Sequence, residues 1–357
     1  MTAGQDRIGT ADLDTFYRDL QDAHLRPLWK LGPDLLPSHP HPQAIPWIWR
    51  ASETYPLAAR AVRAVPVDRG GERRVLSLAN PGLNGQPYAA GTLWAGLQCL
   101  GPGEVAPAHR HTPGAIRFVL TGTGVWTTVS GVRCDMRPGD LVLTPSWQWH
   151  DHTNGGEQNM VWFDGLDLPL ISFLDAVFYE QYPDYAQPVT DTPPADAATL
   201  AAGYADGAAR QTGPDPSPLL TYRWADTDAA LARLARSRDD AMVTAEFINP
   251  TNGTSALPTL SCAMSRLLPG RRTQPLRRVG NAVFVVFKGA GHSVIEGAGV
   301  DWSAGDIFVA PSWAATEHTS ADGADLFVLA DTPVLRALGL YREQTLAQPQ
   351  HVHGILP

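Results

Sequence analysis

Hydrophobic and polar positions follow two different periods along this chain. Between residues 10 and 30, apolar side chains such as Leu13, Phe16 and Leu20 recur at helical spacing, which predicts an amphipathic helix in an N-terminal arm. From about residue 72, the pattern changes to short β-type runs separated by Gly, Pro and Asn. Runs of this kind are typical of an antiparallel sandwich or barrel.

The second half of the chain repeats the first. The pair Asn80-Pro81 recurs as Asn249-Pro250. Three longer runs then recur in the same order: TLWAGLQCLGPG as TLSCAMSRLLPG, RFVLTGTG as FVVFKGAG, and GDLVLTPSW as GDIFVAPSW. An internal repeat of this length predicts two copies of one β-barrel domain. Residues 185–228, rich in Pro, Ala, Asp and Thr, have the composition of a linker.

These patterns predict a mainly β protein with five consecutive parts. The limits we expect are as follows: 1–71, N-terminal helical arm; 72–184, first barrel; 185–236, linker; 237–345, second barrel; 346–357, C-terminal tail.

Composition and charge narrow the function classes. A net charge of -9 without a long Lys/Arg stripe argues against nucleic acid as a partner. No apolar run approaches the ~20 residues that span a bilayer, and the N-terminus lacks the features of a secretory signal. Three scattered cysteines without a Cys-x-x-Cys pair support neither a disulfide framework nor a thiolate zinc site. We therefore expect a soluble cytoplasmic protein without a membrane partner.

Three histidines of the first copy carry the chemistry. His109 and His111 are two residues apart on one expected strand, so both point to the same face, and His150 can meet them from a facing strand. Three convergent imidazoles form a metal site. Neutral imidazoles suit Fe, Zn, Cu and Ni, so the ligands alone leave the metal open, including a zinc hydrolase or hydratase.

The segments HRHTPGAIRFVLTGTG and PSWQWHDH resemble the two signature motifs of the cupin superfamily. Ala115 stands about where the cupin glutamate is expected, and Trp147 replaces the glycine of the second motif. A first cupin with three histidines and no glutamate, joined to a second cupin, resembles the gentisate 1,2-dioxygenase family, which includes enzymes acting on salicylate and 1-hydroxy-2-naphthoate. The resemblance implies a bicupin of two tandem jelly-roll-like barrels and a homotetramer.

The same resemblance implies the reaction and its cofactor. One Fe(II) per chain would be held by His109, His111 and His150. A small aromatic hydroxy-carboxylate and O2 would react there, and gentisate (2,5-dihydroxybenzoate) would be cleaved to maleylpyruvate. Both oxygen atoms would enter the product.

Strand parity and the family motif together suggest the groups around the metal. Trp94, Gly96 and Gln98 alternate on one strand and should share a face. Arg117 has the parity of the ligand histidines and could pair with a substrate carboxylate. Only one of Arg73 and Arg74 can face inwards, and we favour Arg73. The expected groups for proton transfer or oxygen orientation are His152 and Asp164.

The second copy is expected to lack metal. At the repeat offset, Leu276, Arg278 and Thr316 replace the three histidines, in chain order. The neighbouring positions change as well, since Ser261, Ser265 and Phe284 replace Trp94, Gln98 and Arg117. None of these residues could hold iron.

Two functions from other classes remain open at this point. One is a non-catalytic bicupin that binds a small molecule, against which the intact histidine triad argues. The other is a metal-dependent isomerase or hydrolase, although such cupins usually keep the glutamate that is missing here.

Overall fold

A computed structural model describes residues 10–69, 71, 74–190 and 217–357. The chain divides into two compact units, residues 1–41 and 42–357. The first unit holds two helices, α1 (Thr10–Asp22) and α2 (Leu28–Leu35). The helical periodicity expected there is confirmed for α1, and α2 is kinked at Gly32. Apolar side chains on both helices are exposed, including Phe16 and Trp29.

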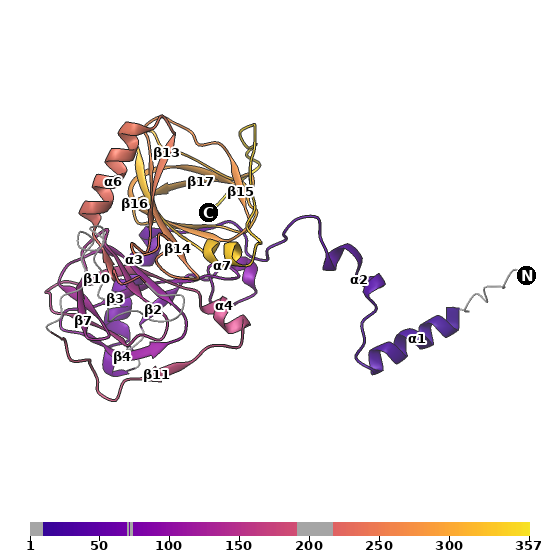
Figure 1. Cartoon of the computed structure of the whole chain (residues 1–357), viewed down its shortest axis with the longest axis horizontal. Helices are drawn as coiled ribbons and strands as arrows, with labels where there is room; N and C mark the ends of the chain where they lie inside the picture. Colours follow the sequence, from indigo (N-terminus) through magenta and orange to yellow (C-terminus); the bar gives the residue numbers. More distant parts are fainter. Residues whose placement is uncertain (1–9, 70, 72–73, 191–216) are drawn as a thin grey trace, which may run out of the picture. The chain divides into compact units, whose positions relative to one another are not determined.

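The second unit contains both sequence repeats, and each repeat forms mainly antiparallel sheets (Figure 1). The first repeat is built from two sheets, whose orders are β12-β8-β5-β10-β3-β2 and β11-β4-β9-β6-β7. Its strands are β2 (Val75–Ser77), β3 (Trp94–Leu100), β4 (Val105–His111), β5 (Ala115–Thr121), β6 (Val125–Val129), β7 (Val132–Asp135), β8 (Leu141–Thr144), β9 (His150–Asn154), β10 (Met160–Leu166), β11 (Tyr179–Gln181) and β12 (Thr221–Tyr222).

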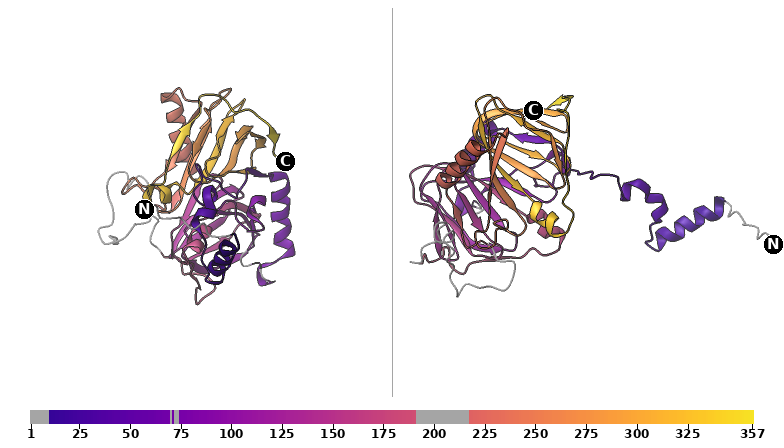
Figure 2. Two further views of the ribbon diagram at one scale, coloured as in Figure 1. Left: turned by 90° about the vertical axis from the view of Figure 1, so that its right-hand side faces the viewer. Right: turned by 45° about the horizontal axis from the view of Figure 1, so that its top comes forward.

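The second repeat is built around the order β13-β14-β20-β16-β19-β15-β21. Its strands are β13 (Met242–Phe247), β14 (Ser261–Leu267), β15 (Leu276–Arg278), β16 (Ala282–Ile295), β17 (Ala298–Ser303), β18 (Ile307–Ala310), β19 (Thr316–Thr319), β20 (Ala324–Ala330), β21 (Glu343–Thr345) and β22 (Gly354–Ile355). The expected β class is confirmed. Figure 2 shows the two sets of strands from two further directions.

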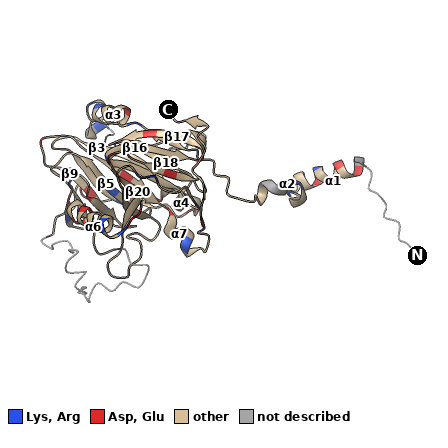
Figure 3. Ribbon diagram, turned by 90° about the horizontal axis from the view of Figure 1, so that it is seen from above, with Lys and Arg blue, Asp and Glu red and all other residues tan. Residues whose placement is uncertain are grey.

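The remaining elements are short helices of the second unit. These are α3 (Ala51–Ala64), η1 (Val67–Arg69), η3 (Pro81–Leu83), α4 (Leu168–Phe173), α6 (Trp224–Ser237) and α7 (Thr332–Ala337). None of the helices among the described residues is long and apolar enough to cross a membrane. In the view of Figure 3, Lys and Arg positions lie on separate elements, among them α3 and α7.

Three parts of the chain are more ordered than the sequence patterns suggested. Within the expected helical arm, β1 (Trp47–Trp49) pairs with β18 of the second repeat. Within the expected linker, β12 pairs with β8, and α6 buries Leu231 against the second repeat. Within the expected tail, β22 pairs with β17. Each of these pairings joins distant segments, so local composition did not reveal it. Residues 191–216 of the expected linker lie outside the described residues.

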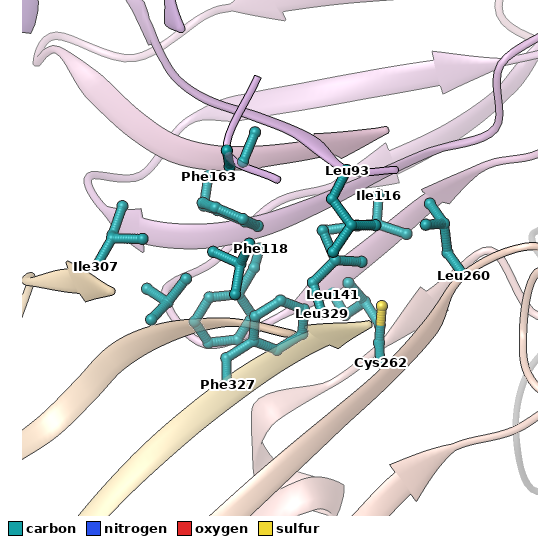
Figure 4. Packing of buried hydrophobic residues seen from close by; sticks show 14 of the residues in the cluster. Leu93, Ile116, Phe118, Leu141, Phe163, Leu260, Cys262, Ile307, Phe327 and Leu329 are labelled. Atoms are coloured by element: carbon teal, nitrogen blue, oxygen red, sulfur yellow. The ribbon is translucent and has the colours of Figure 1, made fainter. Parts of the chain in front are cut away.

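One hydrophobic core joins the two repeats. Phe118 of β5 stacks on Phe327 of β20, with ring centroids 4.2 Å apart, and Phe163 of β10 packs beside them (Figure 4). A Cβ at Gly165 would lie 2.3 Å from a methyl carbon of Leu329, so the close approach of β10 and β20 requires glycine there. The three cysteines are buried and form no disulfide.

Two equivalent hydrogen bonds cross between the repeats at this core. The Thr92 hydroxyl donates to Asp331, and the Thr259 hydroxyl donates to Asp167. Each carboxylate also accepts from a backbone N–H of its own repeat, at 2.9 Å in both cases. Burial raises the pKa of both groups, that of Asp167 to about 6.

Substitution of Thr92 by Val should destabilise the protein. The change keeps the side-chain volume but leaves the buried Asp331 carboxylate with one donor fewer, which we expect to cost about 1–3 kcal/mol of unfolding free energy. Urea unfolding measures the loss. Thr153→Val on β9, where no hydrogen bond crosses to the second repeat, is the control. Equal midpoints for the two variants would contradict the role of this hydrogen bond.

Candidate metal centre

Three histidines of the first repeat converge as strand parity requires. His109 and His111 lie on β4, and His150 is the direct cross-strand partner of His109 on β9. One ring nitrogen from each residue lies within 4.8 Å of the others, and no comparable group of His, Cys, Asp or Glu occurs elsewhere in the described residues. The triad therefore has the spacing of a metal site.

Backbone carbonyls set the tautomer of all three rings. The Nδ1–H groups of His109, His111 and His150 donate to the carbonyl oxygens of Pro107, Pro113 and Gln148, at 2.8, 2.7 and 3.0 Å. Because a carbonyl can only accept, Nδ1 must carry the proton and Nε2 must carry the lone pair. Hydrogen bonds of this kind orient metal-ligating imidazoles.

Burial keeps the His150 imidazole neutral. The pKa of His150 falls well below its usual value, chiefly because burial disfavours the charged ring and secondarily because Arg117 is close. No carboxylate belongs to the triad, so a divalent ion bound there would keep its full charge. Such a site favours an anionic chelating ligand.

The loop before β9 has an unusual backbone that both repeats share. Trp147 stands where the cupin motif has glycine, and its φ of 63° lies in the left-handed region that favours glycine. Its backbone N–H donates to the carbonyl of His111 at 2.9 Å. Trp313 has a φ of 67° and donates in the same way to Arg278. In each repeat, this hydrogen bond therefore connects the loop of the second motif to the equivalent residue of the first motif, which is His111 or Arg278.

A cavity of about 410 Å³ adjoins the three imidazoles. Most of the groups expected around the metal line this cavity. They are Trp94, Gln98, Arg117, His152 and Asp164. The Trp94 indole N–H donates to Ser77 at 3.1 Å, which holds the ring in place.

Gly96 and one residue of the pair Arg73 and Arg74 were also expected around the metal. Gly96 is not among the residues that line the cavity. A Cβ there would lie 2.8 Å from the Trp94 ring and 2.7 Å from Val75, so glycine makes room for the indole instead. Arg73 lies outside the described residues. Arg74 is buried and pairs with Glu104, and it donates to the carbonyls of Val65 and Cys99.

Arg117 and Asp164 form a buried pair at the wall of the cavity. They are direct cross-strand partners on β5 and β10, and the Arg117 Nε lies 3.6 Å from an Asp164 oxygen. Arg117 also donates to Thr144, whereas its Nε has no hydrogen-bond partner. Burial raises the pKa of Asp164 to about 6, although Arg117 and a hydrogen bond from Trp162 act in the opposite direction.

His152 does not hydrogen-bond to Asp164. Its Nδ1 lies 2.8 Å from the Thr127 hydroxyl, and its ring packs on Trp162. The pKa of His152 falls well below its usual value, first because of burial and then because of Arg117. The two groups therefore act as separate polar contacts of one cavity.

One wall of the cavity was not anticipated from the sequence. Strand β11 pairs with β4, and its Tyr179 ring lies 5.5 Å from that of His109. Val177 and Phe178 of the same segment also line the cavity. Three residues form too short a run to show strand periodicity, so only the pairing with β4 reveals this wall.

Comparisons with known proteins agree on one family. Residues 96–166 match the family model described as a cupin domain. A gentisate 1,2-dioxygenase from a Streptomyces species is 46% identical over 340 residues, which cover 92% of this chain and 94% of that protein. A 5-aminosalicylate 1,2-dioxygenase from a Comamonas species is 38% identical over 347 residues, which cover 95% and 91%. The gentisate adduct of the salicylate 1,2-dioxygenase from Pseudoaminobacter salicylatoxidans superposes with a TM-score of 0.85, at 37% identity and 98% coverage of both chains.

Replacement of His111 by Ala should abolish metal binding. Two imidazoles cannot replace three, so we expect the metal content after anaerobic loading with Fe(II) to fall from about one ion per chain to nearly none. Elemental analysis of the desalted protein measures it. Arg278→Gln, at the equivalent position of the second repeat, should leave the content unchanged. Two ions per chain in the unmodified protein would contradict a single site.

Proposed function

Because the chain belongs to the gentisate 1,2-dioxygenase family and is therefore a ring-cleaving dioxygenase, we propose that its substrate is gentisate. The ring would be cleaved with O2 to give maleylpyruvate. The observation that carries this proposal is a carboxylate-free histidine triad that shares one cavity with the buried cation Arg117. The same chemistry on salicylate or 1-hydroxy-2-naphthoate is the alternative, and activity with each compound distinguishes them.

We further propose Fe(II) as the metal, held by the Nε2 atoms of His109, His111 and His150. Three neutral nitrogen donors fit this ion, and their Nδ1–H groups are already committed to backbone carbonyls. When bound, Fe(II) would supply coordination positions for substrate and O2 and a route for electrons between them.

Arg117 would bind the substrate carboxylate. One Nη of its guanidinium donates to Thr144 and its Nε faces Asp164, which fixes the plane of the group. The other Nη is then the donor for the ligand. In a protein of net charge -9, a buried cation in the cavity supplies the local attraction that an anionic substrate requires.

Trp94, Gln98, His152 and Asp164 would position the aromatic ring and its hydroxyl groups. The Trp94 indole is held by Ser77 and covers one wall, while the Gln98 amide offers a donor and an acceptor. Asp164 has a pKa raised to about 6, so it is ionised near neutral pH and can accept a proton from a ring hydroxyl. The neutral His152 would form a hydrogen bond to the substrate or to oxygen instead.

The assembly and location of the enzyme also remain proposals. Family membership supports a homotetramer that acts in the cytoplasm. The exposed Phe16 and Trp29 of the N-terminal unit are compatible with contacts to another copy. Sedimentation analysis gives the mass of the assembly.

Oxygen consumption with gentisate tests the function and the role of Arg117 together. After anaerobic loading with Fe(II), we expect oxygen uptake and a ring-fission product. Arg117→Met should lower kcat/KM about ten- to hundredfold, mainly through KM, because one charge-assisted contact is lost. Arg133→Met, which breaks an exposed ion pair with Asp135, is the control. Absence of uptake with gentisate, salicylate and 1-hydroxy-2-naphthoate by the iron-loaded protein would refute the proposal.

The rate should depend on pH through Asp164. Its pKa of about 6 lies above the usual value, so the carboxylate gains a proton as pH falls through 6 and can then no longer accept one from a ring hydroxyl. We expect kcat/KM to be constant above pH 7 and to decline below 6. In Asp164→Asn that inflection should disappear, whereas an unchanged profile would show that another group titrates.

A further inference from the structure

The second repeat encloses its own cavity, of about 370 Å³. It corresponds to the metal cavity of the first repeat, because Phe284 and Val328 are cross-strand partners where Arg117 and Asp164 stand in the first. Both Phe284 and Val328 line the cavity. The volume lies within the range of small-molecule sites. The exchange of an ion pair for two apolar side chains gives the cavity an apolar wall.

Arg278 brings a positive charge to this cavity. It occupies the position of His111, as the matching hydrogen bonds from Trp313 and Trp147 show. The side chain of Arg278 lines the cavity, and no ion pair or hydrogen bond engages it within the described part of the chain. The carboxylate on the paired strand, Glu343, accepts a hydrogen bond from the Tyr341 hydroxyl at 2.6 Å.

His318 supplies a second donor. The Trp302 indole N–H donates to the Ser293 hydroxyl at 2.7 Å, and that hydroxyl lies 2.6 Å from Nδ1 of His318. In the tautomer in which the Ser293 hydroxyl donates to Nδ1, the neutral ring carries its proton on Nε2 and can donate it to a ligand. Burial and the charge of Arg278 together lower the pKa of His318 to about 3, so the ring stays neutral.

The acidic groups of this cavity select among anions. Glu246 and Glu343 contribute to its lining and are exposed. Two arginines, Arg278 and Arg336, also line the cavity, so these four side chains together carry no net charge. Arg336 lies over the Tyr341 ring. A single negative charge can be matched by Arg278, whereas the two carboxylates disfavour a multiply charged ligand such as phosphate. Aliphatic and aromatic groups, including Phe284, Val328 and Ala314, offer contact to an apolar body.

We propose that the second barrel binds an aromatic monocarboxylate without metal, through Arg278. The carboxylate pairs with the Arg278 guanidinium and accepts from His318, while the ring lies against Phe284 and Val328. Leu276 and Thr316 replace the other two metal ligands, so no ion competes for this position. The site does not depend on which aromatic acid the first barrel cleaves.

Equilibrium dialysis of labelled benzoate against the iron-loaded full-length chain tests this site. We expect Arg278→Gln to remove one bound benzoate per chain or to weaken its binding at least about tenfold. Arg277→Gln is the matched control, since the adjacent Arg277 pairs with Glu296 instead. Ala314→Phe should also remove the bound benzoate, because the larger side chain fills the cavity while Arg278 remains. Both cavity variants should retain the iron and the ring-cleaving rate of the unmodified enzyme.

Three results would overturn the proposal. The first is an equal benzoate stoichiometry and affinity in the unmodified protein and in Arg278→Gln. The second is that benzamide, which has the same shape without the charge, binds to the Arg278-dependent site as tightly as benzoate. The third is displacement of benzoate from that site by equimolar inorganic phosphate.

Discussion

The stacked contact between Phe118 and Phe327 determines where the groups of the active site point. Side chains alternate across a strand, so a Phe118 that faces the shared core requires Arg117 to face the cavity of the first barrel. On β10, the burial of Phe163 in the same core directs Asp164 into that cavity. The cross-strand register then sets Arg117 opposite Asp164. A one-residue shift of either strand would turn its phenylalanine towards the cavity and its charged residue towards the core.

The same alternation applies in the second barrel but leads to different chemistry. Phe327 faces the shared core, so the next residue, Val328, faces the second cavity. On β16, Val285 belongs to the core and Phe284 lines the cavity. Core-facing positions are therefore apolar in both repeats, because each must contribute to one interface. Cavity-facing positions are not constrained by that interface, which allows the two barrels to differ in the side chains that line their cavities.

The features that could be predicted from the sequence are those that depend on short residue spacings or on the internal repeat. The parity of His109 and His111, and their meeting with His150, follow from strand geometry alone. The position of β11 over the ligands and the pairing of β1 with β18 depend on contacts between distant segments. The role of Gly96 beneath the Trp94 indole also depends on a rotamer, which a period of two cannot specify. Local patterns therefore locate the histidine triad, while the outer wall of the cavity requires the fold.

A triad without a carboxylate and an adjacent cation together explain why this site suits anionic ligands. A carboxylate ligand would cancel part of the charge of a divalent ion, and none is present. Arg117 adds a positive charge whose burial is offset mainly by Asp164. Since the pKa of Asp164 is about 6, this offset weakens when the carboxyl group is protonated, and the net charge of the cavity then rises. The attraction for an anion and the stability of the buried pair therefore change in opposite directions with pH.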